Sequence, residues 1–396
     1  TALSTYVEIY LAKEGHDGVV GLNLLEKVQT PNLACLYGAL LAGVDYVIMG
    51  AGIPREIPGA LDLLSQHQSA SLKIHVVGST EDHLSYFHPQ ELFPQALIHT
   101  LKRPYFFPIV SSAVLAANLK KKSTGVVDGF IVETAKAGGH NAPPRGPMQL
   151  SDLGEPIYGV RDNVDMADMK ALELPFWMAG SWATHALIEE ALSAGAHGIQ
   201  VGTLFAFCEE SGLSAENRDF ILKQIRENND PENGWIFTDP HSSPTGFPFK
   251  AVRMQGSVSE TDLYEKRQRI CDLGYLRHAY MNENGQVGFR CPAEPVADFQ
   301  KKSGNAEDTV GKKCLCNALM SNIGMGQRFS SAETITRSGS TEELPLLTAG
   351  DDLNDLKRLL NGRDKYHAVD VINYLLTPPL ATATADKGSS GQLCLG

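Results

Sequence analysis

Short apolar runs alternate with amphipathic helical patterns along the first 250 residues of the chain. The apolar runs are rich in Val, Ile and Phe and end at glycine or polar residues, which is typical of buried strands. Strands are therefore predicted at residues 19–25, 72–77, 105–110, 126–133 and 175–179. Helices are predicted at residues 32–41, 114–119 and 183–192. This alternation indicates parallel strands joined by crossover helices, so the pattern predicts an α/β fold.

Residues 39–50 and 191–202 repeat one helix-to-strand unit, ALLAGVDYVIMG and ALSAGAHGIQVG. In each copy a helix ends at a glycine, and a short apolar run follows before another glycine. Doubly wound sheets and closed barrels both use such units. No Gly-x-Gly-x-x-Gly opens a helix, whereas glycines and polar residues follow many strands, as at the mouth of a barrel. We therefore predict a (β/α)8 TIM barrel.

The pattern changes after about residue 250. Helices are predicted at residues 260–275, 352–360 and 368–376, and a loop or linker is predicted at residues 329–346. We predict two domains, a barrel domain at residues 1–250 and a mainly helical C-terminal extension with a flexible tail at residues 251–396.

The composition is that of a globular protein, with 43% hydrophobic and 20% charged residues among 396. The net charge of −12 argues against nucleic acid as a partner. No apolar stretch approaches the roughly 18 residues of a membrane span, and no signal peptide opens the chain. We expect a cytoplasmic protein that does not bind membranes.

The cysteines and histidines do not have the spacing of common metal sites. Seven cysteines, an odd number at irregular intervals, indicate reduced thiols. Cys271, Cys291, Cys314 and Cys316 offer thiolates, but a Cys-x-Cys pair lacks the Cys-x-x-Cys spacing of zinc knuckles. We predict no metal.

The stretch that most strongly indicates chemistry is AKAGGHNAPPRG at residues 135–146, directly after the predicted strand 126–133. Glycine has no Cβ, so Gly138 and Gly139 let the backbone lie flat against a planar ligand. His140 then brings a titratable imidazole to that ligand. The alternative is a hydrogen-bonded loop histidine without a catalytic role.

Two further turns, MAGSWAT at residues 178–184 and QVGTLF at residues 200–205, follow consecutive predicted strands. Backbone N–H groups at the N-termini of helices bind phosphate well. The two turns therefore predict a two-sided cradle for a phosphate monoester. The alternative is two unrelated glycine turns.

Four elements stand in the order seen in the nitronate monooxygenase family, formerly 2-nitropropane dioxygenases, which also includes FMN-dependent enoyl-acyl-carrier-protein reductases. They are Gly-Leu-Asn at 21–23, Ala-Gly-Gly-His at 137–140, Ala-Gly-Ser at 179–181 and Gln-Val-Gly-Thr at 200–203. The chain resembles this family over about residues 14–250, and the resemblance implies a flavin-binding barrel with FMN as cofactor.

The resemblance also implies roles for individual residues. It implies His140 as the catalytic base beside the flavin ring. The implied cofactor contacts are Asn23, Glu133, Gly138, Gly139 and Gln200 around the flavin, and Gly180, Ser181, Gly202 and Thr203 around its phosphate. Arg145 would meet a carboxylate or nitro group of the substrate, or else is a surface residue. Phe247 lies in residues 243–250, a candidate lid over the cleft.

Two features depart from the family. Ser181, followed by Trp182, replaces the second glycine of the phosphate turn, which leaves the conformation of that turn open. Family members open with a strand beside the flavin ring, and this chain begins at Thr1 without one. Our hypothesis is that the tail, residues 387–396, occupies that early barrel position; a disordered tail is the alternative.

These observations predict an FMN-dependent oxidoreductase, most like a nitronate monooxygenase that oxidises nitronates or nitroalkanes with dioxygen. The first alternative is an enoyl-acyl-carrier-protein reductase that uses NAD(P)H, acts on an acyl carrier protein, and serves in trans with a polyketide or polyunsaturated fatty-acid synthase. The second is a flavin- or phosphate-binding protein without turnover. A homo-oligomer fits each of these functions.

Overall fold

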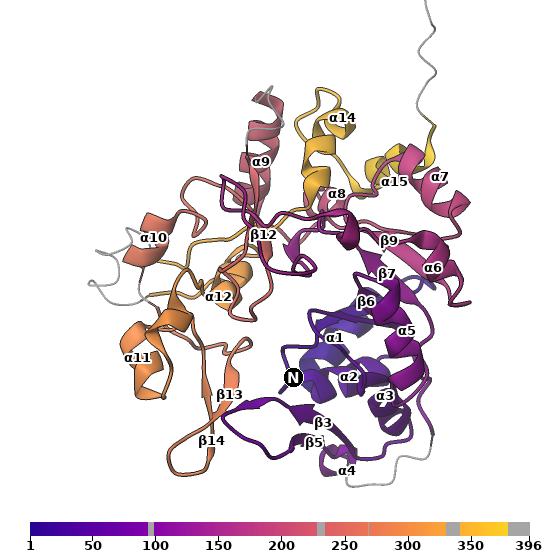
Figure 1. The fold of residues 1–396 in the computed structure, drawn as a ribbon. Coiled ribbons are helices and arrows are strands. Elements are labelled where there is room, and N and C mark those ends of the chain that lie inside the picture. Colours follow the sequence, from indigo (N-terminus) through magenta and orange to yellow (C-terminus); the bar gives the residue numbers. More distant parts are fainter. Residues whose placement is uncertain (94–98, 228–233, 268, 330–340, 379–396) are drawn as a thin grey trace, which may run out of the picture.

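A sheet of six parallel strands organises the N-terminal part of the molecule (Figure 1). The computed structural model describes residues 1–93, 99–227, 234–267, 269–329 and 341–378. The strands, in spatial order, are β1 (Gly21–Leu25), β2 (Tyr46–Gly50), β6 (Tyr105–Val110), β7 (Phe130–Glu133), β9 (Phe176–Ala179) and β10 (Gly198–Gln200). All five neighbouring pairs run parallel, which confirms the α/β class.

The connections between these strands contain helices. The helices of this part are α1 (Ala2–Ala12), α2 (Asn32–Leu41), α3 (Ile57–Ser65), α5 (Ala113–Lys122), α6 (Met166–Lys170), α7 (His185–Ser193), α8 (Thr203–Ala206) and α9 (Ala215–Glu227), with a 3-10 turn η1 (Val160–Asp162). Ser112 and Thr184 begin α5 and α7, because their hydroxyls accept backbone N–H groups three residues on. The bounds of α2 and β6 coincide with the predicted ones.

Both faces of the parallel sheet are apolar, because side chains alternate between the two sides of each strand. One set of alternate residues packs with the helices in a large core that includes Val47, Met49, Phe106, Phe130, Val132, Phe176 and Met178. The opposite face carries a smaller cluster around Phe107, Ile131 and Ala179, where the rings of Phe107 and Trp177 stack at 4.9 Å.

Within the described residues the main parallel sheet has six strands and not eight, and β1 and β10 form its two edges. The described part of the chain therefore does not form a closed eight-stranded barrel. Residues 379–396 lie outside the described residues, and so does the hypothesis that the tail occupies an early barrel position.

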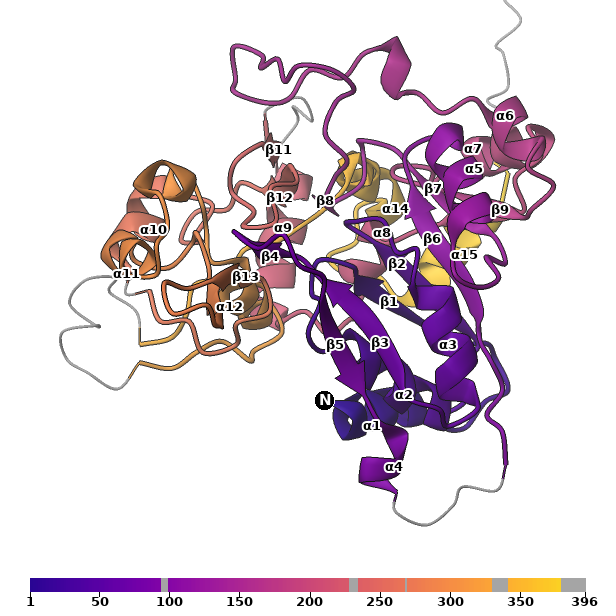
Figure 2. The same cartoon turned by 60° about the horizontal axis from the view of Figure 1, so that its bottom comes forward.

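The predicted strand 72–77 is wrong as a member of the parallel sheet. Its residues divide between β3 (Ala70–Ile74), which pairs antiparallel with β5 (His83–Phe87), and β4 (Val76–Val77). Figure 2 shows the β3–β5 hairpin beside α2 and α3, followed by α4 (Pro89–Leu92). An apolar run indicates a strand, but it does not distinguish a parallel neighbour from a hairpin partner.

The rest of the chain adds small sheets and short helices. β8 (Gly139–His140), β11 (Ile236–Asp239) and β12 (Phe249–Val252) form one sheet, and β4 pairs with the hairpin β13 (His278–Met281) and β14 (Val287–Arg290). The helices are α10 (Thr261–Lys266), α11 (Val296–Lys301), α12 (Leu315–Ser321), α14 (Leu356–Leu360) and α15 (Ala368–Leu376), with 3-10 turns η2 (Ala306–Thr309) and η3 (Asp351–Asp355).

The last helices pack against the N-terminal part, beside α7 and α8 (Figure 1). Their buried residues, among them Leu356 and Val371, share one apolar cluster with Leu204 and Ile221. The predicted helix 368–376 is confirmed, while the helix predicted over 260–275 spans only α10. The division at residue 250 stays a prediction.

Candidate functional site

The carboxyl ends of the parallel strands bring several predicted site residues to one edge of the sheet. Glu133, the last residue of β7, pairs with Ala179 of β9, which in turn pairs with Gln200 of β10. Burial raises the pKa of Glu133 to about 8. The Gln200 Oε1 atom is buried without a hydrogen-bond partner among the described residues. This edge therefore presents a carboxyl group and an unsatisfied acceptor.

His140 lies in a short sheet rather than in a loop. Its strand β8 pairs antiparallel with β12, so that His140 faces Phe249 and Gly139 faces Lys250. The next residue continues this contact, since Asn141 N donates to Pro248 O at 2.9 Å. The candidate lid 243–250 is thus partly a strand neighbour of His140.

The His140 imidazole is held by one hydrogen bond and one ring contact. Nε2 lies 2.7 Å from Ser243 Oγ, and the ring meets Phe249 edge-on at 4.9 Å. Burial lowers the pKa of His140 to about 4. The imidazole is therefore neutral at physiological pH, the form in which one ring nitrogen can accept a proton.

The first predicted phosphate turn is strained at Ser181, where the family resemblance implies a glycine. Ser181 has a φ of +62°, a left-handed conformation that is unfavourable for residues with a Cβ. Its neighbour Gly180 also has a positive φ, and a Cβ there would lie 2.5 Å from Thr134 Oγ1. The turn keeps the glycine-like conformation in spite of the substitution.

The segment 349–352 lies between the two predicted phosphate turns. Ser181 Oγ accepts from Asp352 N at 3.1 Å, and Thr203 Oγ1 accepts from Gly350 N at 2.9 Å. A Cβ on Gly138 would lie 2.6 Å from the carbonyl carbon of Ala349. The structure therefore brings Gly138, the Ser181 turn and the Thr203 turn together around this segment. Sequence reasoning missed the segment, because nothing in its pattern indicates a contact 147 residues away.

A cavity of about 680 Å³ adjoins the first predicted phosphate turn. Among its lining residues are Gly180, Ser181, Lys136 and Lys250. Lys250 is buried, and its Nζ lies 2.7 Å from the Asp351 carboxylate. Sequence reasoning missed Lys250 as a site residue, although a lysine inside the apolar strand of β12 is itself an unusual signal. The cavity volume falls within the range of about 300–1,000 Å³ that small-molecule sites occupy.

The remaining predicted residues lie in different surroundings. Arg145 lines a small pocket with Glu133, and its guanidinium donates to Ser111 O at 2.9 Å. Phe247 is half-buried and its N–H donates to Thr245 Oγ1 at 3.3 Å. Asn23 is exposed on the edge strand β1, outside the lining of the 680 Å³ cavity. Gly202 has open space where a Cβ would stand.

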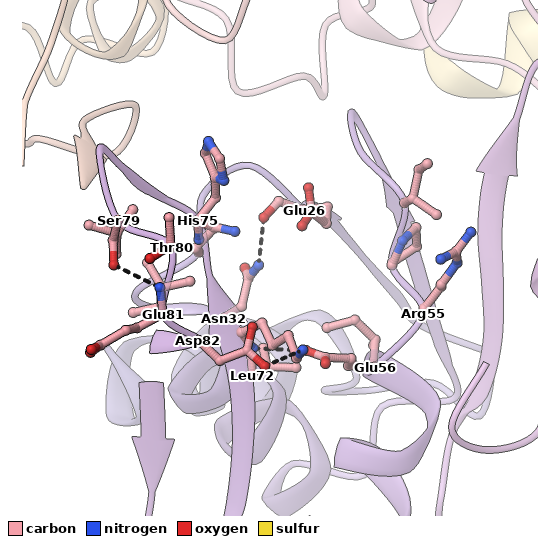
Figure 3. A pocket seen from close by; sticks show the side chains of 17 residues that line it. Glu26, Asn32, Arg55, Glu56, Leu72, His75, Ser79, Thr80, Glu81 and Asp82 are labelled. Carbon is pink, nitrogen blue, oxygen red and sulfur yellow. Dashed lines mark hydrogen bonds and ion pairs between the residues drawn. The ribbon is translucent and has the colours of Figure 1, made fainter. Parts of the chain in front are cut away.

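A second cavity, of about 580 Å³, lies where β1 and β2 end (Figure 3). Its side chains are mostly polar and largely paired with one another. Lys73 Nζ lies 2.8 Å from Asp82, and Lys73 N donates to Glu56 at 2.8 Å. Burial raises the pKa of Glu26, which also lines this cavity. None of the predicted site residues lines it.

In the described part of the chain, no three His, Cys, Asp or Glu side chains stand in a group that could hold a metal ion. No helix of the described part has the length and apolar character needed to cross a membrane.

Comparison with known proteins supports the resemblance stated above. Residues 62–228 match the family model of nitronate monooxygenase. The chain is 29% identical to a probable nitronate monooxygenase of Bacillus subtilis (strain 168) over 133 residues, which is 34% of this chain. That match spans 36% of the length of the curated relative. The predicted resemblance is therefore confirmed, over a shorter region than residues 14–250.

Solved structures that superpose on this chain have low sequence identity to it. FabK from Thermotoga maritima superposes with a TM-score of 0.50 at 14% identity, over 95% of this chain and 80% of FabK. A nitroalkane oxidase from Streptomyces ansochromogenes superposes with a TM-score of 0.46 at 14% identity, over 95% of this chain and 84% of that chain. At such identity the FabK superposition demonstrates a shared fold only.

Proposed function

We propose that this chain, which carries a nitronate monooxygenase region at residues 62–228, is an FMN-dependent oxidoreductase that oxidises nitronates or nitroalkanes with dioxygen. One observation supports the proposal. Glu133 ends β7, the Gly180–Ser181 turn follows the neighbouring strand β9, and that turn lines a cavity of about 680 Å³. In parallel α/β folds this end of the sheet holds the ligand and the catalytic groups.

The Gly180–Ser181 turn fits the FMN phosphate, because it lines the cavity together with Lys136 and Lys250, whose ammonium lies 2.7 Å from Asp351. The Gly202–Thr203 turn would complete the cradle only if the segment 349–352, which hydrogen-bonds to Ser181 and Thr203, makes room for the phosphate. The buried and unsatisfied Gln200 Oε1 and Asn141 Oδ1 would accept hydrogen bonds from the flavin. FMN, when bound, accepts the electrons of the substrate and passes them to dioxygen.

The protein's own contribution is proton transfer and positioning. A neutral His140 can remove the proton on the carbon next to a nitro group, which converts a nitroalkane to its nitronate. A nitronate has already lost that proton, so its oxidation does not require the base. Glu133 carries a proton at neutral pH and can donate a hydrogen bond to the cofactor or the substrate. Arg145 and Phe247 are the proposed substrate contacts.

The alternatives differ in their second substrate. An enoyl-acyl-carrier-protein reductase would need NAD(P)H and an acyl carrier protein, and would use the same flavin site. A non-catalytic flavin-binding protein would hold the cofactor without turnover. Assembly into a homo-oligomer remains part of the proposal for either enzyme.

The closed barrel and the domain division also belong to the proposal. Two more parallel strands between the free edges of β1 and β10 would complete eight strands. An experimental structure with those positions filled by backbone would support the barrel, and solvent at both edges would refute it.

One experiment separates the three functions. The absorbance spectrum of the purified protein is recorded, and the protein is then challenged with a nitronate in air and, separately, with NAD(P)H plus an enoyl thioester. We expect a flavin spectrum and oxygen consumption with the nitronate. Bleaching by NAD(P)H alone, with reoxidation by the enoyl thioester, would favour the reductase. A spectrum with flavin and no turnover in either case would favour the binding protein.

His140→Ala tests the base. We expect retained flavin and nitroalkane turnover lowered about 100-fold or more, because general base catalysis contributes about that much. His75→Ala, in the separate 580 Å³ cavity, is the matched control and should be unchanged. Full nitroalkane turnover in His140→Ala would remove the assignment.

A further inference from the structure

We propose that Ser243 is a positioning residue for His140: its hydroxyl holds Nε2 of the imidazole and leaves Nδ1 as the nitrogen that takes the substrate proton. The inference rests on the proposed function for its chemistry, and on the fold alone for its geometry. Ser243 lies 103 residues from His140 in the sequence, and no motif connects the two.

The contact between the two side chains is short, and its Ser243 side is buried. His140 Nε2 and Ser243 Oγ are 2.7 Å apart, and Ser243 has no exposed surface. Among the described residues His140 Nδ1 has no hydrogen-bond partner. A histidine that acts as base needs one nitrogen free and the other oriented by a fixed partner, because the second hydrogen bond selects the tautomer. Ser243 is the residue in the described structure that meets this requirement.

A second hydroxyl extends the hydrogen bond. Thr245 Oγ1 lies 2.7 Å from Ser243 Oγ, and either atom can be the donor. Each hydroxyl also accepts a backbone N–H, from Thr245 N at 3.1 Å and from Phe247 N at 3.3 Å. When Nε2 carries a proton, Ser243 Oγ accepts a hydrogen bond from Nε2–H and donates its own proton in a hydrogen bond to Thr245 Oγ1. The hydrogen bond from Nε2–H to Ser243 Oγ is therefore present both before and after His140 takes up a proton at Nδ1.

The backbone around Ser243 is anchored from both sides. Lys312 Nζ donates to Ser243 O at 3.0 Å, and Lys313 N donates to Ser242 O at 2.8 Å. On the other side β12 pairs with the strand that carries His140. The segment 312–313 of the C-terminal part thus fixes the backbone of Ser242 and Ser243, and through Ser243 it helps to position His140.

The charged groups on the segments that pack against His140 are bound elsewhere. The backbone of Lys250 in β12 pairs with Gly139, but its ammonium lies 2.7 Å from the Asp351 carboxylate, and the Lys312 ammonium donates to Ser243 O. No carboxylate among the described residues contacts the imidazole. The hydroxyl of Ser243 is therefore the group that stabilises the protonated ring at Nε2, and the hydrogen bond strengthens when the ring becomes charged.

Ser243→Ala tests the assignment through a comparison of two substrates. We expect retained flavin, a kcat for the nitroalkane lowered about tenfold with KM changed less than about threefold, and a kcat for the matching nitronate changed less than about twofold. The reason is that only the nitroalkane requires His140 to remove a proton. Ser243→Thr keeps the hydroxyl and should restore the nitroalkane reaction.

Ser242→Ala is the matched control, because the Ser242 hydroxyl is buried next to Ser243 and has no hydrogen-bond partner among the described residues. It should leave both reactions unchanged. Equal losses for the nitroalkane and the nitronate in Ser243→Ala would indicate a merely structural role and overturn the proposal, as would no loss in either.

A measurement without turnover separates this inference from the proposed function. Nitrogen NMR of the ring-labelled full chain reads the tautomer of His140, assigned with His140→Ala. We expect one dominant tautomer, protonated at Nε2, in the parent chain and a mixture in Ser243→Ala. The same tautomer mixture in both proteins would overturn the inference even if nitronates are oxidised. A difference between them in a protein that oxidises no nitronate would leave the positioning intact and refute the proposed function.

Discussion

Glu133→Gln should stabilise the protein at alkaline pH and leave its stability at acid pH almost unchanged. Burial raises the pKa of this carboxyl from 4.5 to about 8 in the folded state. The unfolded chain releases the proton near its ordinary pKa, so between pH 4.5 and 8 the folded state binds more protons than the unfolded state. The free energy of unfolding therefore falls as pH rises through that window.

The magnitude follows from the two pKa values. They differ by about 3.5, and each unit corresponds to about 1.36 kcal/mol, which gives an upper value of about 5 kcal/mol. The Glu133 side chain keeps some solvent exposure, so screening by water reduces the expected effect to about 2–3 kcal/mol. A glutamine of the same shape never ionises and therefore avoids this cost.

Urea unfolding of the parent chain and of Glu133→Gln, at intervals from pH 5 to 9, measures the effect. The two free energies of unfolding should agree near pH 5 and separate by about 2–3 kcal/mol above pH 8, with the variant more stable. Glu189→Gln, an exposed position on α7, should follow the parent chain at every pH. Parallel curves for the parent and Glu133→Gln would refute the buried, protonated carboxyl.

Three further substitutions test the cofactor site and the stability of the fold. Lys250→Met removes the buried ammonium beside Asp351 and should weaken FMN binding about tenfold in a fluorescence titration, while unchanged affinity would exclude Lys250 from the cofactor site. Gly138→Ala places a Cβ 2.6 Å from the Ala349 carbonyl carbon and should lower the free energy of unfolding by about 1–3 kcal/mol, a cost that a well-tolerated variant would disprove. Arg267→Met leaves the Glu343 carboxylate buried without its partner and should cost about 3–5 kcal/mol in urea unfolding, whereas the double variant Arg267→Met with Glu343→Leu should recover most of it.

Local patterns predicted the parallel sheet well, because the apolar runs and their bounding glycines are properties of short segments. The bounds of α2, β6 and α15 follow from helical or strand periodicity and from the residues that end each element. The strand at 72–77 failed for the opposite reason. Its partner β5 lies in the next few residues, and the run itself carries no information on which neighbour it pairs with.

The parts of the site that the sequence did not indicate are contacts between distant segments. Ser243 reaches His140 only because β12 pairs with β8, and Gly350 reaches Thr203 only because η3 packs beside α8. Lys250 was visible as a lysine in an apolar strand, but its role needed the position of Asp351, 101 residues further on. The spacing of residues along the chain identifies groups that lie in one turn. Which turns come into contact depends on the tertiary fold.

The most direct test of the central claim is an experimental structure of the protein with FMN. We expect the phosphate within hydrogen-bond distance of the N–H groups at Gly180–Ser181 and Gly202–Thr203, with the flavin ring beside His140. FMN bound in the cavity around Glu26 and Lys73, or no FMN bound at saturating concentration, would contradict the account.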